Sequence, residues 1–309
     1  MRIAQPNIDE FYAAISAKLR GQEVPCAVTG GLACVEFGVA QHTEDCDLIC
    51  PPEHAKTLLQ VLRASLFGAV PCRYRKTSPP LDVRWLAGGY TAHFLWPTDA
   101  PEKPSLDVFG APPRVSTPWE KETVGRFAGR HTVAEMKRTN RRKDWDQATA
   151  LGLAMLEAND PRGWLHIFDA TTLRTLIKKL SLGEEEIRQR PVLQLAKSSS
   201  PLLDRAVQTE IEFWTHLDAL RLKVYQASHE SYGRALLKVA KKPPTDLIAQ
   251  HQTRVELAEK LLPERPMQDY GIPRLIEEAR DATAVGLDPA ILQFLPQVAS
   301  HFNNIASIS

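Results

Sequence analysis

The chain has 309 residues, of which 43% are hydrophobic and 24% are charged, and its formal net charge is +1. This length suits two domains. The near-neutral charge excludes a general attraction to nucleic acid or anionic membrane, so such a contact would need a local patch. No stretch approaches the ~20 apolar residues of a membrane-spanning helix, and the first residues lack the apolar run of a signal peptide. We therefore expect a cytoplasmic protein without a membrane partner.

The five cysteines all lie in the first quarter of the chain and form no CxxC pair: Cys26, Cys34, Cys46, Cys50 and Cys72. An odd number without a distant Cys/His set argues against a zinc ribbon and against a disulfide framework. We expect small buried thiols.

Apolar periodicity predicts an amphipathic helix over residues 8–20, with Asn7 as its N-cap and Gly21 as its stop. The apolar run at 24–29 favours a buried strand. It ends at Gly30 and Gly31, and residues 32–38 follow as a short helix.

Residues 45–50 are predicted to form a second strand, with a helix from Pro51 onward. Residues two apart on a strand point to the same face, so Asp45 and Asp47 should project side by side.

Strand-like segments follow at 72–76, 81–86, 89–96 and 105–110, and helical periodicity dominates from about residue 132. This order predicts an α+β protein with two domains. A mixed sheet with flanking helices should span residues 1–131, and a helical C-terminal domain should span residues 132–309.

The combination of a Gly-Gly turn and an Asp-x-Asp strand points to phosphate and metal chemistry. Adjacent glycines between a strand and a helix allow the backbone to approach a phosphate closely. Two carboxylates on one strand face suit hard cations such as Mg²⁺, and a pair of metals can hold both oxygens of an in-line displacement. Taken singly, the glycines also suit an ordinary turn, and the aspartates a solvated strand face.

The run VTGGLACVEFG…HTEDCDLIC resembles the signature of the polymerase-β-type nucleotidyltransferase superfamily, closest to the bacterial AbiEii-like toxins. The resemblance covers about the first half of the chain and implies a nucleotidyltransferase fold. It makes Asp45 and Asp47 the Mg²⁺ or Mn²⁺ ligands, and Gly30 and Gly31 the cradle of a nucleoside triphosphate such as ATP. It also implies an RNA or tRNA acceptor and a cognate antitoxin as partners.

The superfamily has a third carboxylate on a later strand, for which Asp82 and Asp107 both offer a Leu-Asp-Val pattern. We prefer Asp107 as the third metal ligand and as the general base, because it follows a predicted hairpin and has apolar neighbours. Asp82 alternates with Arg84 and can pair with it. We expect His93 to be structural.

A second polar cluster lies at residues 131–151. Lys137, Arg141, Asp144 and Ala148 have the spacing of one helix face. The cluster resembles a motif that follows the catalytic strands in AbiEii-like proteins. That resemblance makes Lys137, with Arg141, a phosphate ligand and Asp144 a functional acid, with Asp146 as a second candidate.

The basic run at 138–143 beside Trp145 could also contact an RNA backbone and stack on a base. The alternative is a solvated charged surface.

We therefore expect an enzyme that transfers a nucleoside monophosphate from a nucleoside triphosphate to an acceptor hydroxyl, with release of pyrophosphate. Two alternatives stay open. One is nucleotidylation of a small molecule, as in aminoglycoside-modifying enzymes. The other is a catalytically silent fold that serves as a binding module. The sequence leaves the acceptor open.

Overall fold

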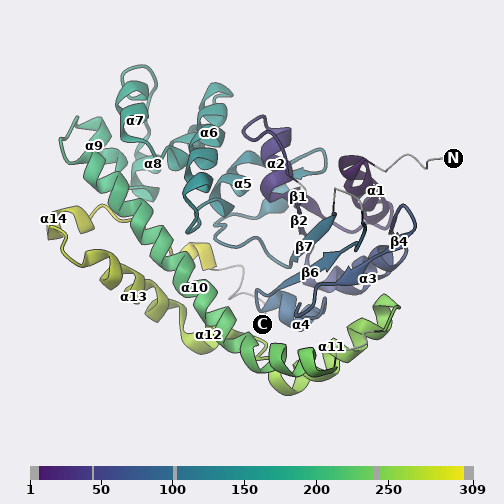
Figure 1. The fold of residues 1–309 in the computed structure, drawn as a ribbon. Helices are drawn as coiled ribbons and strands as arrows, with labels where there is room; N and C mark the ends of the chain where they lie inside the picture. The colour runs from purple at the N-terminus through teal and green to yellow at the C-terminus, as the bar shows by residue number, and fades with distance from the viewer. Residues whose placement is uncertain (1–6, 44, 100–102, 240–243, 303–309) are drawn as a thin grey trace.

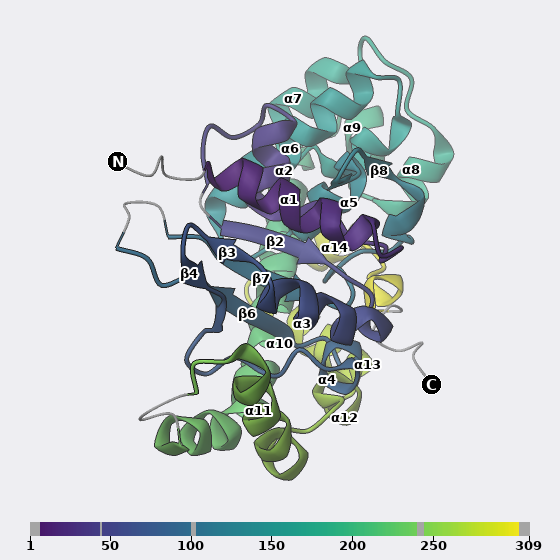
Figure 2. The ribbon, with the colours of Figure 1, turned by 90° about the vertical axis from the view of Figure 1, so that its right-hand side faces the viewer.

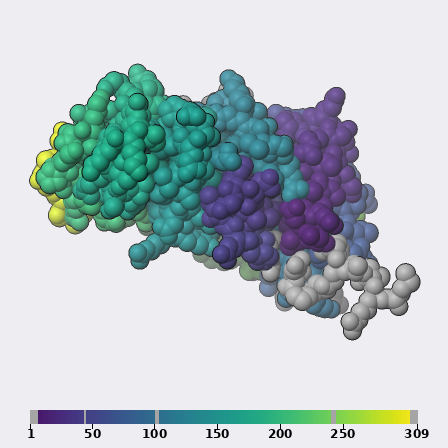
Figure 3. All heavy atoms as spheres, turned by 90° about the horizontal axis from the view of Figure 1, so that it is seen from above, coloured from purple at the N-terminus to yellow at the C-terminus, as the bar shows by residue number. Residues whose placement is uncertain are grey.

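The computed structural model describes residues 7–43, 45–99, 103–239 and 244–302. The protein is α+β, with a mixed sheet and its helices in the N-terminal half and a helical C-terminal region (Figure 1). Seen from above, the two parts occupy opposite ends of an elongated molecule (Figure 3). None of the helices in the described ranges combines the length and apolar character needed to cross a bilayer.

The main sheet has seven strands in the order β5-β6-β7-β2-β1-β9-β8. Neighbouring strands are antiparallel except for two parallel pairs, β2 with β7 and β1 with β9. In sheet order, the strands are β5 (Arg73–Tyr74), β6 (Thr91–Leu95), β7 (Ser105–Phe109), β2 (Asp45–Ile49), β1 (Ala27–Thr29), β9 (Phe127–Ala128) and β8 (Thr123–Val124). A separate two-stranded ribbon pairs β3 (Leu66–Phe67) with β4 (Val70–Pro71).

The central strands bury one face and leave the other partly open. Alternate residues of β2, β6 and β7 are buried, among them Leu48, Phe94 and Leu106. They share one hydrophobic core with α1 (Ile8–Arg20) and α3 (Ala55–Arg63), which lie beside the sheet in Figure 2. The opposite face carries the polar residues of the same strands, as expected when side chains alternate along a strand.

Short helices connect these strands: α2 (Gly30–Glu36), α4 (Val83–Ala87) and the 3₁₀ turns η1 (Pro52–His54) and η2 (Trp119–Lys121). Helix α5 (Arg130–Met136) belongs to the same core, because Val133, Ala134 and Met136 are buried in it. The domain boundary expected between residues 131 and 132 stays a prediction.

The helical region is organised around α10 (Leu203–Val239), which is 37 residues long and runs diagonally across the molecule (Figure 1). The elements before it are α6 (Arg142–Glu157), η3 (Pro161–His166), α7 (Ala170–Leu176), α8 (Glu184–Gln189) and α9 (Leu193–Lys197). Those after it are α11 (Leu247–Leu261), α12 (Pro266–Tyr270), α13 (Ile272–Ala284), α14 (Pro289–Leu292) and η4 (Ala299–Phe302).

Most of the predicted elements are confirmed, including the helix over residues 8–20 with its Asn7 cap. The strand predicted at 81–86 is wrong, because these residues begin α4 and Asp82 accepts the amide of Arg84 as its N-cap. The helix buries Leu86 in the core of the sheet, together with Leu81, and buries Trp85 in a separate cluster with Tyr232 and Leu262. All five cysteines are free thiols; the predicted burial is confirmed for four of them, and Cys26 is partly exposed.

Candidate functional site

The register of two parallel strands brings the predicted carboxylates together. Asp47 of β2 lies directly opposite Asp107 of β7, and Asp45 lies opposite Ser105. Asp45, Asp47 and Asp107 therefore project from the partly open face of the sheet. The Ser105 hydroxyl donates a hydrogen bond to Asp45.

Gly30 leaves the space that the Asp47 side chain occupies. Its φ of +63° lies in the left-handed region, and a Cβ built on it would lie 1.7 Å from Asp47 Oδ2. A Cβ on Gly31 would instead meet Thr43 Oγ1 at 2.8 Å. A side chain at Gly31 would thus meet the segment before β2, whereas one at Gly30 would meet a carboxylate within β2.

The pKa of Asp47 is raised to about 7: burial raises it most, Asp107 and Asp45 add to the rise, and Lys137 and Arg141 oppose it. Three carboxylates on one sheet face therefore repel one another, and the cations of the second polar cluster partly offset this repulsion. The two clusters that the sequence separates by about 90 residues act on the same side chain.

Asp107 is already paired in this structure. The Nδ1 of His93 lies 2.7 Å from Asp107 Oδ1, and the Nη1 of Arg75 lies 3.7 Å from the same oxygen. Because an ionised carboxylate only accepts hydrogen bonds, Nδ1 of His93 carries a proton, and in the neutral ring Nε2 is the acceptor. His93 and Arg75 were not among the predicted site residues, and only their cross-strand position beside Asp107 reveals them.

Asp82 lies outside this cluster. It caps α4 and forms an ion pair with Arg84 at 3.0 Å. This agrees with its predicted pairing.

Lys137 and Asp144 meet, although not on one helix as predicted. Helix α5 ends at Met136 and α6 begins at Arg142, so the expected continuous helix face is wrong. The turn between the helices instead folds back, and Lys137 Nζ lies 3.4 Å from Asp144 Oδ1. Asp144 is fully buried and also accepts from Thr139 Oγ1 at 2.6 Å and Arg141 Nε at 2.8 Å. Asp144 therefore holds the turn and its two cations in place.

The basic run at 138–143 does not form one open surface. Arg138 is buried, whereas Arg141, Arg142 and Lys143 are exposed, and Arg141 also forms an ion pair with Asp144. Trp145 is 6% exposed and packs edge to face against Phe168, with ring centroids 4.7 Å apart. It is therefore not available to stack on a base, and the predicted stacking role is wrong. Asp146 is exposed.

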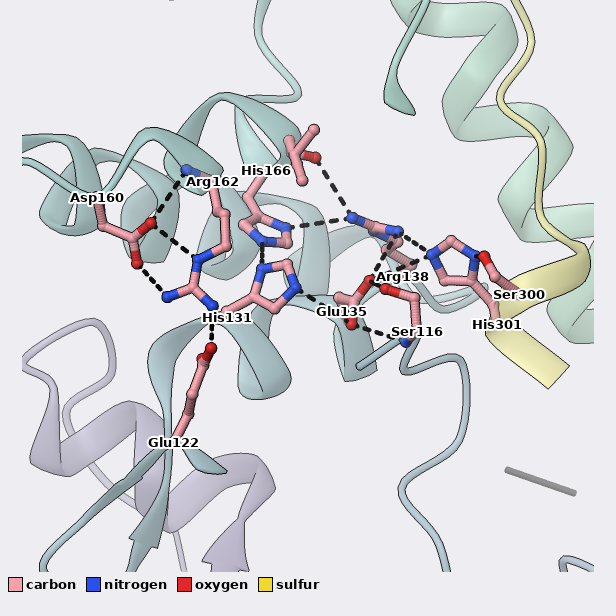
Figure 4. A network of polar contacts seen from close by, with 11 residues as sticks. Ser116, Glu122, His131, Glu135, Arg138, Asp160, Arg162, His166, Ser300 and His301 are labelled. Carbon is pink, nitrogen blue, oxygen red and sulfur yellow. Dashed lines mark hydrogen bonds and ion pairs between the residues drawn. The ribbon is translucent and has the colours of Figure 1, made fainter. Parts of the chain in front are cut away.

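A buried polar network holds α5, the helix that ends next to Lys137 (Figure 4). Glu135 accepts hydrogen bonds from the amide and hydroxyl of Ser116 at 3.0 and 2.8 Å. Its Oε1 lies 3.2 Å from His301 Nε2, so the last described helical turn, η4, contacts α5. Burial opposes ionisation of Glu135, but His301, His131 and Arg138 outweigh this and lower its pKa below the ordinary range.

Two histidines connect α5 to η3 within this network. Arg138 Nη2 lies 3.4 Å from His166 Nδ1, and His166 Nε2 lies 2.9 Å from His131 Nδ1. Because a guanidinium can only donate, Nδ1 of His166 accepts, and its Nε2–H then donates to His131. Each ring needs one acceptor nitrogen, so both are neutral. Burial lowers the pKa of both histidines, that of His166 strongly.

Within the described ranges, no group of three or more His, Cys, Asp or Glu side chains is arranged to hold a metal ion. Asp107 is turned to His93 and Arg75, whereas Asp45 and Asp47 of β2 lie beside it on the same sheet face. Comparison of the chain with protein-family models, curated protein sequences and solved structures found no match.

Proposed function

We propose that this chain is a metal-dependent nucleotidyltransferase that transfers a nucleoside monophosphate from a nucleoside triphosphate to an acceptor hydroxyl. The observation that carries the proposal is the register of β2 and β7, which sets Asp47 opposite Asp107 with Asp45 on the same face. Gly30 adjoins Asp47, and Lys137 acts electrostatically on that carboxylate. A strand pair, a glycine turn and a cation thus meet at one place.

The donor set fits a divalent cation. Asp45 and Asp47 offer the oxygen ligands that Mg²⁺ and Mn²⁺ prefer, and Mg²⁺ is commonly held by one or two carboxylates together with substrate phosphates. This explains how a site without three converging protein ligands can still suit the metal. When bound, Mg²⁺ would neutralise phosphate charge and relieve the repulsion among these carboxylates.

Other side chains of the protein would bind the phosphates and accept the proton of the attacking hydroxyl. Lys137 is held by buried Asp144 and can donate hydrogen bonds to the phosphates, with Arg141 beside it. The acceptor oxygen forms a bond to the α-phosphorus, the bond from that phosphorus to the bridging oxygen breaks, and pyrophosphate leaves. Asp107 with His93 would accept a hydrogen bond from the attacking hydroxyl and receive its proton.

The test is transfer of label from α-labelled triphosphates in the presence of Mg²⁺, total RNA and a small-molecule extract. We expect Asp45→Ala and Asp47→Ala to abolish labelling of the acceptor while far-ultraviolet circular dichroism stays native. Asp281→Ala on α13, an exposed aspartate, is the matched control and should keep full activity. Full activity of either β2 variant would refute the catalytic assignment. Absence of metal-dependent triphosphate binding in the wild type would favour the silent module.

A further inference from the structure

A cavity of about 400 Å³ adjoins the candidate site. Its floor is the partly open face of the sheet, where His93 of β6 and Asp107 and Phe109 of β7 line it. Its far wall is α10, which contributes Leu222 and Tyr225. This volume is that of a pocket for a small organic molecule.

Aromatic rings shape the wall opposite Asp107. Tyr90 and Tyr225 both line the cavity and pack edge to face, with ring centroids 5.2 Å apart at 71°. The hydroxyl of Tyr225 donates to the carbonyl oxygen of Gly88 at 3.0 Å, which fixes the ring against the loop after α4. Such rigid rings offer flat apolar contact to a planar or alicyclic body.

The charges around the cavity are balanced within the protein. Arg221 lines it, but its Nη2 lies 3.0 Å from Asp218 Oδ1. Asp107 is paired with His93 and Arg75. A polycation would be repelled by Arg221, and a polyanion would be repelled by Asp107. The attracting charge in each case is already paired within the protein, so the cavity favours an uncharged ligand.

The polar groups on the floor of the cavity need a hydrogen-bond donor from the ligand. With Nδ1 of His93 donating to Oδ1 of Asp107, the second oxygen of Asp107 is a hydrogen-bond acceptor, and Nε2 of the neutral His93 ring is another. A ligand hydroxyl is a matching donor. Because Asp107 also lies opposite Asp47, a hydroxyl placed there would adjoin the proposed triphosphate site.

We propose that this cavity is the acceptor site, and that the acceptor is a small uncharged molecule with an aromatic or alicyclic body and a hydroxyl group. This inference rests on the proposed nucleotidyl transfer and names its substrate class. An RNA base would not stack on Trp145, because that side chain is buried, and Arg138 beside the basic run is buried as well. The product would be a phosphodiester of that hydroxyl, with pyrophosphate released and the hydroxyl proton passed to the His93–Asp107 pair.

The binding test uses 2-naphthol, an uncharged bicyclic alcohol, as the probe. Gln226 lines the cavity from an exposed position on α10, so Gln226→Trp should fill the space without disturbing the core. Ser231→Trp, exposed on the same helix, is the matched control. By calorimetry, we expect saturable binding to the wild type and to the Ser231 variant, and at least a tenfold loss of affinity in Gln226→Trp. No binding to the wild type, or equal binding to all three proteins, would overturn the cavity assignment.

Two further measurements separate this inference from the proposed function. Calorimetry with Mg²⁺ and triphosphate should give the same affinity for all three proteins, whereas Gln226→Trp should lose transfer of label into the small-molecule fraction. Naphthol binding without any triphosphate binding would remove the acceptor role together with the proposed function. Label that enters RNA at an unchanged rate in Gln226→Trp would overturn the acceptor site alone.

Discussion

Single residues at this site are constrained more by their neighbours than by their own chemistry. Gly30 contacts the Asp47 carboxylate, Asp47 faces Asp107, and Asp107 is held by His93. A change at any one of them moves the next. Substitutions here should therefore affect both stability and ligand binding, and the sign of the effect on stability depends on the residue changed.

Gly30→Ala should be more damaging than Gly31→Ala. An alanine at φ +63° costs about 1–2 kcal/mol, and its Cβ would collide with Asp47. The Cβ of Gly31→Ala meets only the Thr43 side chain, in a backbone conformation that alanine adopts. We expect Gly30→Ala to lower the free energy of unfolding by about 1–3 kcal/mol and to weaken Mg²⁺–triphosphate binding at least tenfold. Urea titration and calorimetry measure both effects. Equal effects of the two substitutions would contradict this contact.

Asp47→Asn should stabilise the metal-free protein at alkaline pH. The folded-state pKa of Asp47 is raised to about 7 from 3.8, so its contribution to stability is intact below pH 3.8 and is lost as the pH rises through 7. Asparagine removes this loss. In EDTA at pH 8, the Tm should rise by roughly 2–4 °C for each kcal/mol of relieved repulsion, and the gain should shrink toward pH 5. The exposed Asp281→Asn should gain nothing at either pH. An unchanged Tm at pH 8 would show that ionisation of Asp47 does not destabilise the folded protein.

At the scale of elements, α5 is the connection between the sheet and the helical region. It is buried in the core of the sheet through Val133 and Met136. Its polar side reaches η3 through His131 and η4 through Glu135. The turn after α5 carries Lys137, so the position of this lysine depends on contacts with three parts of the chain.

The paired histidines should make the stability of the protein depend on pH. Their folded-state pKa values lie below the ordinary value of 6.5, so the unfolded chain binds protons that the folded protein does not. Stability is therefore complete above pH 6.5 and falls as the pH drops below it. The slope approaches about 1.4 kcal/mol per pH unit for each histidine that stays neutral. Urea unfolding between pH 8 and 5 measures it.

His166→Gln should reduce that slope, whereas His54→Gln, which lies outside the network, should not. Wild-type stability that is the same at pH 7.5 and 5.5 would contradict the neutral pair. At lower pH, Glu135 adds to the loss, because its depressed pKa gives stability that disappears as the carboxylate is protonated.

Across the whole molecule, Asp218 of α10 joins the two halves. It accepts from Arg114 Nη1 at 2.6 Å, from Arg221 at 3.0 Å and from the amide of Asn140 at 3.3 Å. Arg114 is 5% exposed and also donates to the carbonyl oxygen of Met136. Burial lowers the pKa of Arg114 to about 10, and Asp218 opposes this shift. The long helix, the turn that carries Lys137 and the wall of the cavity are thus held by one carboxylate.

Asp218→Ala should therefore loosen the whole arrangement. It leaves the guanidinium of Arg114 buried without its ionic partner, which costs about 3–5 kcal/mol. We also expect weaker Mg²⁺–triphosphate binding, because the turn at 137–141 loses its bond to α10. Urea unfolding and calorimetry measure the two effects. Asp204→Ala, which removes an exposed ion pair with Arg174 at the start of the same helix, should match the wild type. Equal stability of the Asp218 and Asp204 variants would rule out this role.

The sequence by itself determined the parts that depend on local periodicity. The spacing of apolar residues gave the helix at 8–20, and the alternation in 45–49 put Asp45 and Asp47 on one face. The cap at Asn7 follows from the residue itself. These features need only neighbours along the chain, so a pattern of a few residues is enough to predict them.

Only the tertiary structure decided which distant residues meet. The parallel pairing of β2 with β7 set Asp107 opposite Asp47, whereas Asp82, with the same local pattern, caps α4. The turn after α5 brought Lys137 to Asp144, against the helical spacing, and packing on Phe168 buried Trp145. The cavity beside His93 is closed by α10, more than 100 residues away in sequence. Strand register and helix packing are set by the burial of whole faces, which no short pattern encodes.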